Sequence, residues 1–134
     1  MNALGTHLLL ELKNCNPRVL DDLPFIRETL LTAAREAGGT ILGESFHQFH
    51  PQGVTGIVAI AESHICIHTW PEFRYAAADI FTCGEHFQPE KAALFLIDKL
   101  EAKEPSVQAI KRGIFTSLPK IQEAQPLKRN GNQW

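Results

Sequence analysis

The residues best suited to chemistry are concentrated in the middle of the chain. Five of the six histidines and two of the three cysteines lie within residues 47–86. The densest stretch is residues 62–72, which read Glu-Ser-His-Ile-Cys-Ile-His-Thr-Trp-Pro-Glu. Its isoleucines alternate with polar residues, and this period of two predicts a β-strand with one apolar face. The other face then carries His64, Cys66 and His68, which must be solvated, hydrogen-bonded or used in chemistry.

One use of these side chains is metal binding. Nitrogen and sulfur ligands for zinc are offered by His64, Cys66 and His68, together with Cys83. Alternate positions of one strand are about 7 Å apart, however, which is wider than the spacing of ligands around a single ion. We therefore expect no metal site here.

A second use is nucleophilic catalysis by a thiol. Either Cys83 or Cys66 is a candidate nucleophile that a neighbouring histidine activates. Neither cysteine stands in a local sequence that resembles a thiol-hydrolase signature, which disfavours this interpretation.

A third use starts from the hydroxyl group of Ser63. A serine at a turn can attack the carbonyl carbon of the residue before it, here Glu62, and this replaces the amide by an ester. A base that removes the serine α-proton then drives β-elimination, which cleaves the chain and leaves dehydroalanine. Loss of ammonia converts this end into a pyruvoyl group, a covalently attached ketone.

The segments around this stretch predict the elements that must position it. Short apolar or alternating segments between turn residues predict strands at residues 5–12, 40–49, 54–61, 65–70, 75–83 and 106–114. Apolar residues that recur every three or four positions predict amphipathic helices over residues 21–37 and after Pro89. The order β-α-β-β-β-β-α-β predicts an α+β fold, a two-layer sandwich with both helices on one face of an antiparallel sheet.

Length and composition predict an ordinary single domain. The chain has 134 residues, 44% of them hydrophobic, and a formal net charge of −2. We place one domain at residues 1–117 and expect the polar segment 118–134 to be a flexible tail. The near-neutral charge disfavours nucleic acid or an anionic membrane surface as a partner. Three cysteines without a CxxC pair favour the reducing cytoplasm.

Taken together, these motifs resemble those of a known family, the short prokaryotic type of S-adenosylmethionine decarboxylase proenzyme. The matching residues are 62–64 (Glu-Ser-His), 67–72 (Ile-His-Thr-Trp-Pro-Glu) and 81–84 (Phe-Thr-Cys-Gly), and the resemblance covers roughly residues 4–102. It implies a self-processing, pyruvoyl-dependent decarboxylase that converts S-adenosylmethionine to its decarboxylated form and CO₂. That product is the aminopropyl donor of spermidine biosynthesis.

The resemblance also implies where the chain is cut. Cleavage between Glu62 and Ser63 gives a β chain of residues 1–62 and an α chain of residues 63–134. The pyruvoyl group derived from Ser63 forms a Schiff base with the amino group of the substrate and withdraws electrons as CO₂ leaves. The family implies no pyridoxal phosphate and no metal as cofactor.

Three further residues receive roles from the resemblance. His68 matches the proton acceptor of processing, Cys83 matches the proton donor of catalysis, and Thr55 stands where the family commonly has a serine that assists processing. A neutral imidazole is a suitable base at cellular pH, and a protonated thiol is a suitable acid. Because strand parity puts Ser63 and His68 on opposite faces, we expect a turn at residues 62–64 to bring them together.

Substrate binding and assembly are implied in the same way. Glu72 matches a carboxylate that accepts hydrogen bonds from ribose hydroxyls, and Trp70 and Phe49 match aromatic positions near the adenine. Family members pair as small protomers, so we expect a homo-oligomer in which residues of two protomers form each active site.

Two departures from the family pattern leave alternatives open. Arg74 stands where many relatives have glycine, and Cys66 stands where serine or threonine is common. An arginine close to Glu72 leaves open a pyruvoyl-dependent arginine or ornithine decarboxylase on the same fold. A non-catalytic paralogue that partners an active subunit is the alternative outside the enzymes.

Overall fold

The computed structural model describes residues 3–115. Its elements in chain order are β1 (Ala3–Lys13), α1 (Pro17–Leu20), α2 (Leu23–Glu36), β2 (Ile41–Gln48), β3 (Val54–Ile60), β4 (Ser63–Trp70), the 3₁₀ helix η1 (Pro71–Phe73), β5 (Tyr75–Thr82), α3 (Pro89–Lys99) and β6 (Glu104–Ile114). The tail predicted at residues 118–134 lies outside the described residues. Among those described, no helix has the length and apolar character that a membrane crossing requires.

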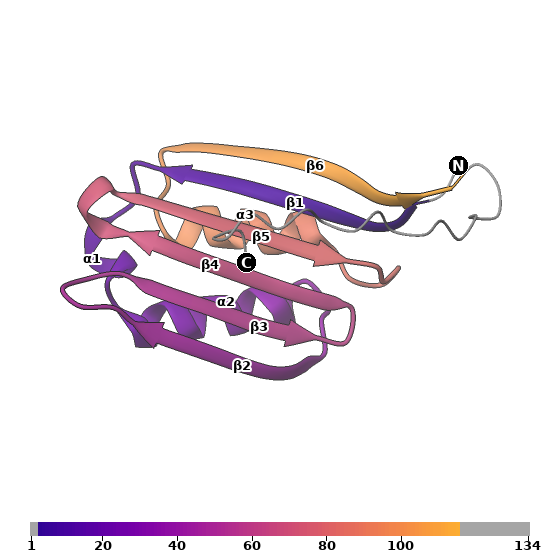
Figure 1. Cartoon of the computed structure of the whole chain (residues 1–134), viewed down its shortest axis with the longest axis horizontal. Helices are drawn as coiled ribbons and strands as arrows, with labels where there is room; N and C mark the ends of the chain where they lie inside the picture. Colours follow the sequence, from indigo (N-terminus) through magenta and orange to yellow (C-terminus); the bar gives the residue numbers. More distant parts are fainter. Residues whose placement is uncertain (1–2, 116–134) are drawn as a thin grey trace, which may run out of the picture.

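The strands form one six-stranded sheet in the order β2-β3-β4-β5-β1-β6, with every neighbouring pair antiparallel. Figure 1 shows the two long helices, α2 and α3, on the same side of this sheet. Helix α2 packs on β2 and β3, and α3 packs on β5 and β1. The predicted two-layer α+β sandwich is therefore confirmed.

Local sequence explains where the long helix α2 begins and ends. The side chain of Asp22 accepts a hydrogen bond from the backbone N of Phe25, which caps the first turn, and Pro24 lies within that turn. The helix stops before Gly38, whose φ of +89° suits a residue without Cβ. The buried face of α2 includes Ile26 and Leu30, which pack into the core between helices and sheet.

Alternation along β4 separates a buried face from an open one. Ile65 and Ile67 are fully buried beneath the helices. The intervening His64, Cys66 and His68 lie on the opposite face of the sheet, as their spacing predicts. No element of residues 3–115 covers that face (Figure 1). The open face is consequently where the chemistry-bearing side chains gather.

The far end of β4 is anchored by the buried hydroxyl of Thr69. Its Oγ1 donates a hydrogen bond to the carbonyl oxygen of Leu20 at 2.7 Å and accepts one from the backbone N of Val54 at 2.8 Å. These bonds tie the end of α1 and the start of β3 to β4, which fixes the position of the neighbouring Trp70.

Candidate active site

The peptide bond between Glu62 and Ser63 lies at the tight connection between β3 and β4. Ser63 is the first residue of β4, and its φ is 151°. Residues that carry a Cβ rarely adopt positive φ values of this kind, so the backbone is strained here. Strain in the ground state favours a reaction that breaks this amide.

The carbonyl oxygen of Glu62 lies against Cys83. The backbone N of Cys83 donates a hydrogen bond to it at 3.0 Å, and the Cys83 Sγ lies 3.5 Å from the same oxygen. Donors at a carbonyl oxygen stabilise the negative charge that develops when a nucleophile attacks its carbon. Cys83 follows β5 directly, and Thr82 pairs with Ser63, so the sheet register places the thiol at this bond.

The side chain of Glu62 is also held in place. Its Oε1 accepts a hydrogen bond from the backbone N of Thr40 at 3.2 Å. A Cβ added at Gly84 would lie 2.6 Å from Glu62 Cγ, so only glycine leaves room for this packing. Cys83 and Gly84 also line a pocket of about 270 Å³.

His68 forms a second cluster, with Thr55. These residues are cross-strand neighbours on β4 and β3, and Thr55 Oγ1 lies 2.9 Å from His68 Nδ1. The hydroxyl that threonine shares with serine makes this hydrogen bond, and the additional methyl group does not prevent it.

The expectation that a turn brings Ser63 to His68 is wrong. Strand β4 is continuous from Ser63 to Trp70 and pairs with β5 along its whole length. Five residues of an extended strand span roughly 17 Å. Within one chain, Ser63 and Cys83 therefore lie together at one end of β4. His68 and Thr55 lie toward the other end of the strand, so the two clusters do not meet.

The residues predicted to bind substrate lie at the His68 end. Phe49 and Trp70 are large aromatic side chains with 46% and 39% of their surfaces exposed. The Trp70 ring stacks on Tyr75 at a centroid distance of 5.4 Å, and Glu72 is exposed in η1. Burial, followed by a hydrogen bond to Glu11, raises the pKa of Tyr75 to about 12, so its phenol stays protonated.

A third cluster, which sequence reasoning missed, joins three strands on the open face. Asp79 on β5 has its Oδ2 at 2.8 Å from His7 Nε2 and at 2.9 Å from His64 Nε2. Within residues 3–115 this is the group whose ligand atoms lie close enough together to hold a metal ion. The zinc ligands considered from the sequence form a different set, namely His64, Cys66, His68 and Cys83. Of these four residues, only His64 belongs to the cluster with His7 and Asp79.

The three thiols are free and differ in their surroundings. Burial, followed by the negative charge of Asp79, raises the pKa of Cys66 to about 11, and burial raises the pKa of Cys15 to about 11. Cys83 is exposed. Because the thiolate is the nucleophilic form, Cys66 is poorly suited to attack a substrate.

We expect iodoacetamide at pH 8 to modify Cys83 at least ten times faster than Cys66. A thiol with a pKa of about 11 is roughly one part in a thousand thiolate at that pH, and Cys15 is both buried and similarly shifted. Peptide mass spectrometry after timed quenching measures the order. Labelling of Cys66 as fast as that of Cys83 would contradict the burial described here.

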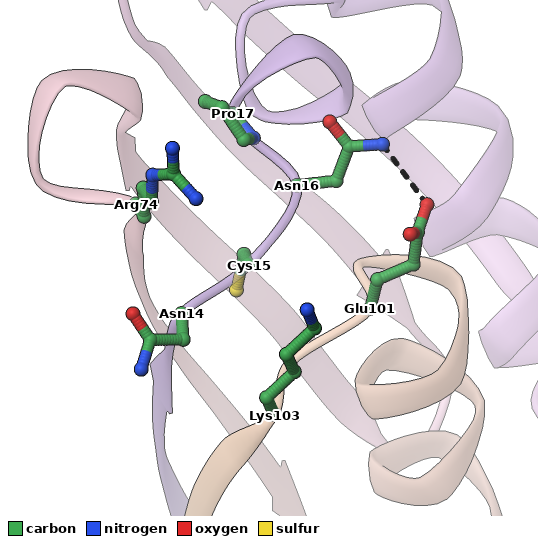
Figure 2. Close-up of a pocket in the computed structure, with 7 residues that line it drawn as sticks. All are labelled: Asn14, Cys15, Asn16, Pro17, Arg74, Glu101 and Lys103. Atoms are coloured by element: carbon green, nitrogen blue, oxygen red, sulfur yellow. Dashed lines mark hydrogen bonds between the residues drawn. The ribbon is translucent and has the colours of Figure 1, made fainter.

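A separate pocket lies beyond the other end of β4, away from the Glu62–Ser63 bond. Figure 2 shows Arg74 and Lys103 bordering this cavity of about 400 Å³, whose lining is Asn14, Cys15, Asn16, Pro17, Arg74, Glu101 and Lys103. Arg74 takes a left-handed conformation, with a φ of 52°, where a glycine is unstrained. Within the described residues it makes no ion pair with Glu72.

Comparison with known proteins decides the family. The family model described as S-adenosylmethionine decarboxylase matches residues 6–113, which is most of the chain. The chain belongs to the S-adenosylmethionine decarboxylase family. The resemblance predicted from the sequence motifs is thereby confirmed.

Individual members of the S-adenosylmethionine decarboxylase family align with this chain over most of their lengths. The S-adenosylmethionine decarboxylase proenzyme of Thermodesulfovibrio yellowstonii is 54% identical over 116 residues, which are 87% of this chain and 86% of that protein. The proenzyme of Caldanaerobacter subterraneus subsp. tengcongensis is 44% identical over 121 residues, 90% of this chain and 98% of that protein. The crystal structure of the adenosylmethionine decarboxylase from Aquifex aeolicus VF5 superposes with a TM-score of 0.81 at 36% identity, covering 91% of this chain and 100% of that one. The predicted enzyme class, a decarboxylase made as a proenzyme, is confirmed.

Proposed function

We propose that the chain cleaves itself between Glu62 and Ser63 and then uses the resulting pyruvoyl group to decarboxylate S-adenosylmethionine, as a step toward spermidine. The observation that carries this proposal is the contact of the Glu62 carbonyl oxygen with two donors of Cys83, at a serine whose backbone is strained. The products are a β chain of residues 1–62 and an α chain of residues 63–134, within one domain at residues 1–117.

Self-cleavage begins with attack of Ser63 Oγ on the carbonyl carbon of Glu62. The backbone N–H of Cys83 stabilises the oxyanion that forms, and collapse of the adduct breaks the amide and leaves an ester. His68 then removes the Ser63 α-proton, and elimination of the Glu62 carboxylate cleaves the chain. The Thr55 hydroxyl, 2.9 Å from His68 Nδ1, orients the imidazole for this step.

Decarboxylation uses residues from both ends of β4. The pyruvoyl group supplies an electrophilic ketone that binds the amine of the substrate and accepts electrons as CO₂ leaves. Cys83, at the same end of the strand as Ser63, donates the proton that replaces CO₂ on the α-carbon. Trp70 and Phe49 stack against the adenine, and Glu72 accepts hydrogen bonds from the ribose. Neither pyridoxal phosphate nor a metal is needed.

Two copies of the chain must contribute to each site. Ser63 and His68 lie roughly 17 Å apart on one strand, so His68 cannot reach the α-proton of Ser63 in its own chain. The open face of the sheet also exposes apolar side chains, including Ile57 and Ile110, at 41% and 42%. If two open faces pack together about a two-fold axis near Cys66, His68 of the partner subunit comes to lie over Ser63. We therefore propose a homodimer with two shared sites.

The free thiols support a cytoplasmic location for the enzyme. All three cysteines of the chain are free, and Cys83 must stay reduced to donate a proton. The reducing cytoplasm satisfies this requirement, and we place the enzyme there.

Reductive trapping tests both the cofactor and the substrate. Cyanoborohydride added during turnover of labelled S-adenosylmethionine should attach the label to the first residue of the α chain, position 63. Arginine and ornithine serve as the competing substrates, and CO₂ release is recorded for all three. Label or CO₂ from arginine or ornithine alone would replace the proposed substrate, and neither from any of the three would favour the non-catalytic paralogue.

Replacing Cys83 with alanine should separate the two reactions. The backbone N–H at 3.0 Å from the Glu62 carbonyl oxygen remains, so processing should slow less than tenfold. Loss of the proton donor should lower CO₂ release by about 10²- to 10⁴-fold. Denaturing mass spectrometry measures the cleaved fraction, and Cys66→Ala is the matched control. Full turnover by the Cys83→Ala enzyme would remove its assigned role.

A further inference from the structure

We propose that His64 is the base that takes the hydroxyl proton of Ser63 in the first step of self-cleavage, and that Asp79 holds the imidazole in the tautomer this step requires. The inference rests on the proposed function and adds to it a catalytic residue, His64, and a positioning residue, Asp79. It concerns the acyl shift, a different proton transfer from the one assigned to His68.

The hydrogen bond to Asp79 determines which nitrogen of His64 is basic. His64 Nε2 lies 2.9 Å from Asp79 Oδ2, and an ionised carboxylate can only accept a hydrogen bond. Nε2 therefore carries the proton in the neutral ring, and Nδ1 keeps a free lone pair. That Nδ1 lies 3.5 Å from Ser63 Oγ, at the long limit of a hydrogen bond, and faces the hydroxyl proton that the acyl shift must remove. A nucleophile, a base and an orienting carboxylate thus follow one another in space.

The orienting carboxylate is itself fixed from a third strand. His7 Nε2 lies 2.8 Å from the same oxygen of Asp79, and Arg112 Nη1 on β6 lies 3.4 Å from His7 Nδ1. Side-chain exposure is only 18% for His7, 27% for Asp79 and 30% for His64. These side chains are partly shielded from water, and the cluster can hold His64 beside the scissile bond.

His64 first accepts and then returns the one proton that moves during the acyl shift. Its Nδ1 accepts the Ser63 hydroxyl proton as the bond from Oγ to the Glu62 carbonyl carbon forms, and the carbonyl electron pair moves to the oxygen at the Cys83 N–H. When the adduct collapses, the bond between the Glu62 carbon and the Ser63 nitrogen breaks. The proton on His64 passes to that nitrogen, which leaves an ester, a free amine and a neutral His64.

The first step can be measured alone in a chain that carries His68→Ala. Elimination is blocked there, so the ester between Glu62 and Ser63 accumulates, and hydroxylamine cuts it to give a fragment that ends in a Glu62 hydroxamate. We expect His64→Asn, added to His68→Ala, to slow this hydroxylamine-dependent cleavage by about 100-fold or more. His86→Asn, an exposed histidine beyond β5, is the matched control and should leave the rate unchanged.

The role of Asp79 has a spectroscopic test. In the uncleaved Ser63→Ala chain, the ¹⁵N shifts of His64 should report a proton on Nε2. The amide of Asp79→Asn can donate to Nε2 instead, so this change should move the proton to Nδ1 and slow ester formation by at least tenfold in the His68→Ala background. A tautomer that stays unchanged, with an unchanged rate, would overturn the positioning role. Because the ¹⁵N measurement uses chains that keep His64, it can be made even if the His64→Asn chain fails to fold.

The remaining outcomes separate this inference from the proposed function. Hydroxylamine cleavage of the His64→Asn, His68→Ala chain at the rate of the His68→Ala chain overturns the role of His64 and leaves the ester route intact. Absence of hydroxylamine cleavage from every variant overturns the ester route, and this inference with it. Loss of ester formation on addition of EDTA overturns the assignment as well, because the three side chains would then act as metal ligands.

Discussion

A chain with alanine in place of Ser63 is expected to stay uncleaved and to release no CO₂ from S-adenosylmethionine. The change removes the hydroxyl that attacks the Glu62 carbonyl carbon and whose oxygen leaves with the Glu62 carboxylate in the elimination. Without that elimination no pyruvoyl group can form. Both activities should therefore disappear entirely, whereas the loss of a general base or acid lowers a rate by about 10²- to 10⁴-fold. Denaturing mass spectrometry and CO₂ release are the two readouts.

Ser106→Ala is the matched control for this variant, because Ser106 is an exposed residue of β6 away from the Glu62–Ser63 bond. It should be processed and should turn over like the unaltered chain. Two fragments from Ser63→Ala would mean that another residue provides the nucleophile, and the site assigned here would be wrong.

Two inactive variants are expected to restore cleavage when they are refolded together. The His68→Ala chain keeps Ser63 and Cys83, and the Ser63→Ala chain keeps His68 and Thr55. Because these two clusters lie roughly 17 Å apart within a chain, His68 of the Ser63→Ala subunit can act on Ser63 of its partner. Alone, His68→Ala should be processed at least about 100-fold more slowly than the unaltered chain.

Mass tags on the two variants show which chain is cut, and native mass spectrometry measures the mixed dimers. Only the His68→Ala chain should yield fragments, in proportion to the mixed dimers present. Mixed dimers without cleavage would contradict action between subunits. Rapid cleavage of His68→Ala by itself would contradict the role of this histidine.

The elements of the fold were predictable wherever the sequence repeats with a clear period. Alternation around Ile65 and Ile67 predicts the buried face of β4, and the three-to-four spacing after Asp22 predicts α2. The short helices α1 and η1 escaped prediction because one turn of helix shows no period. Both begin with a proline, Pro17 and Pro71, and proline also marks a simple break in a strand.

The sequence motifs name the members of the candidate site, whereas their arrangement in space could not be predicted from the sequence. Motif spacing points to Ser63, His68 and Cys83, yet spacing alone does not tell which of them meet. Cys83 reaches the Glu62 carbonyl because β4 and β5 pair in one particular register, and a continuous β4 keeps His68 away. Odd or even position along a strand shows which face of the sheet a side chain occupies. Whether two residues of one strand can touch depends on the distance between them along that strand.

The cluster of His7, His64 and Asp79 could not be predicted from the sequence for a related reason. His7 and Asp79 are 72 positions apart and meet only because β1 pairs with β5. A single histidine in a first strand is most simply a hydrogen-bonded strand residue. That Asp79 is the partner of His7 follows from the order of the strands in the sheet, and no local sequence pattern predicts that order.

The mass of the purified, denatured protein tests the central claim most directly. Self-cleavage predicts two polypeptides, residues 1–62 with an intact Glu62 carboxylate and residues 63–134 lighter by one ammonia than a chain that starts with serine. Reaction with a hydrazine should label only the second of them, at its ketone. A single polypeptide with the mass of all 134 residues, or an α chain that begins with an unaltered serine, would contradict the account.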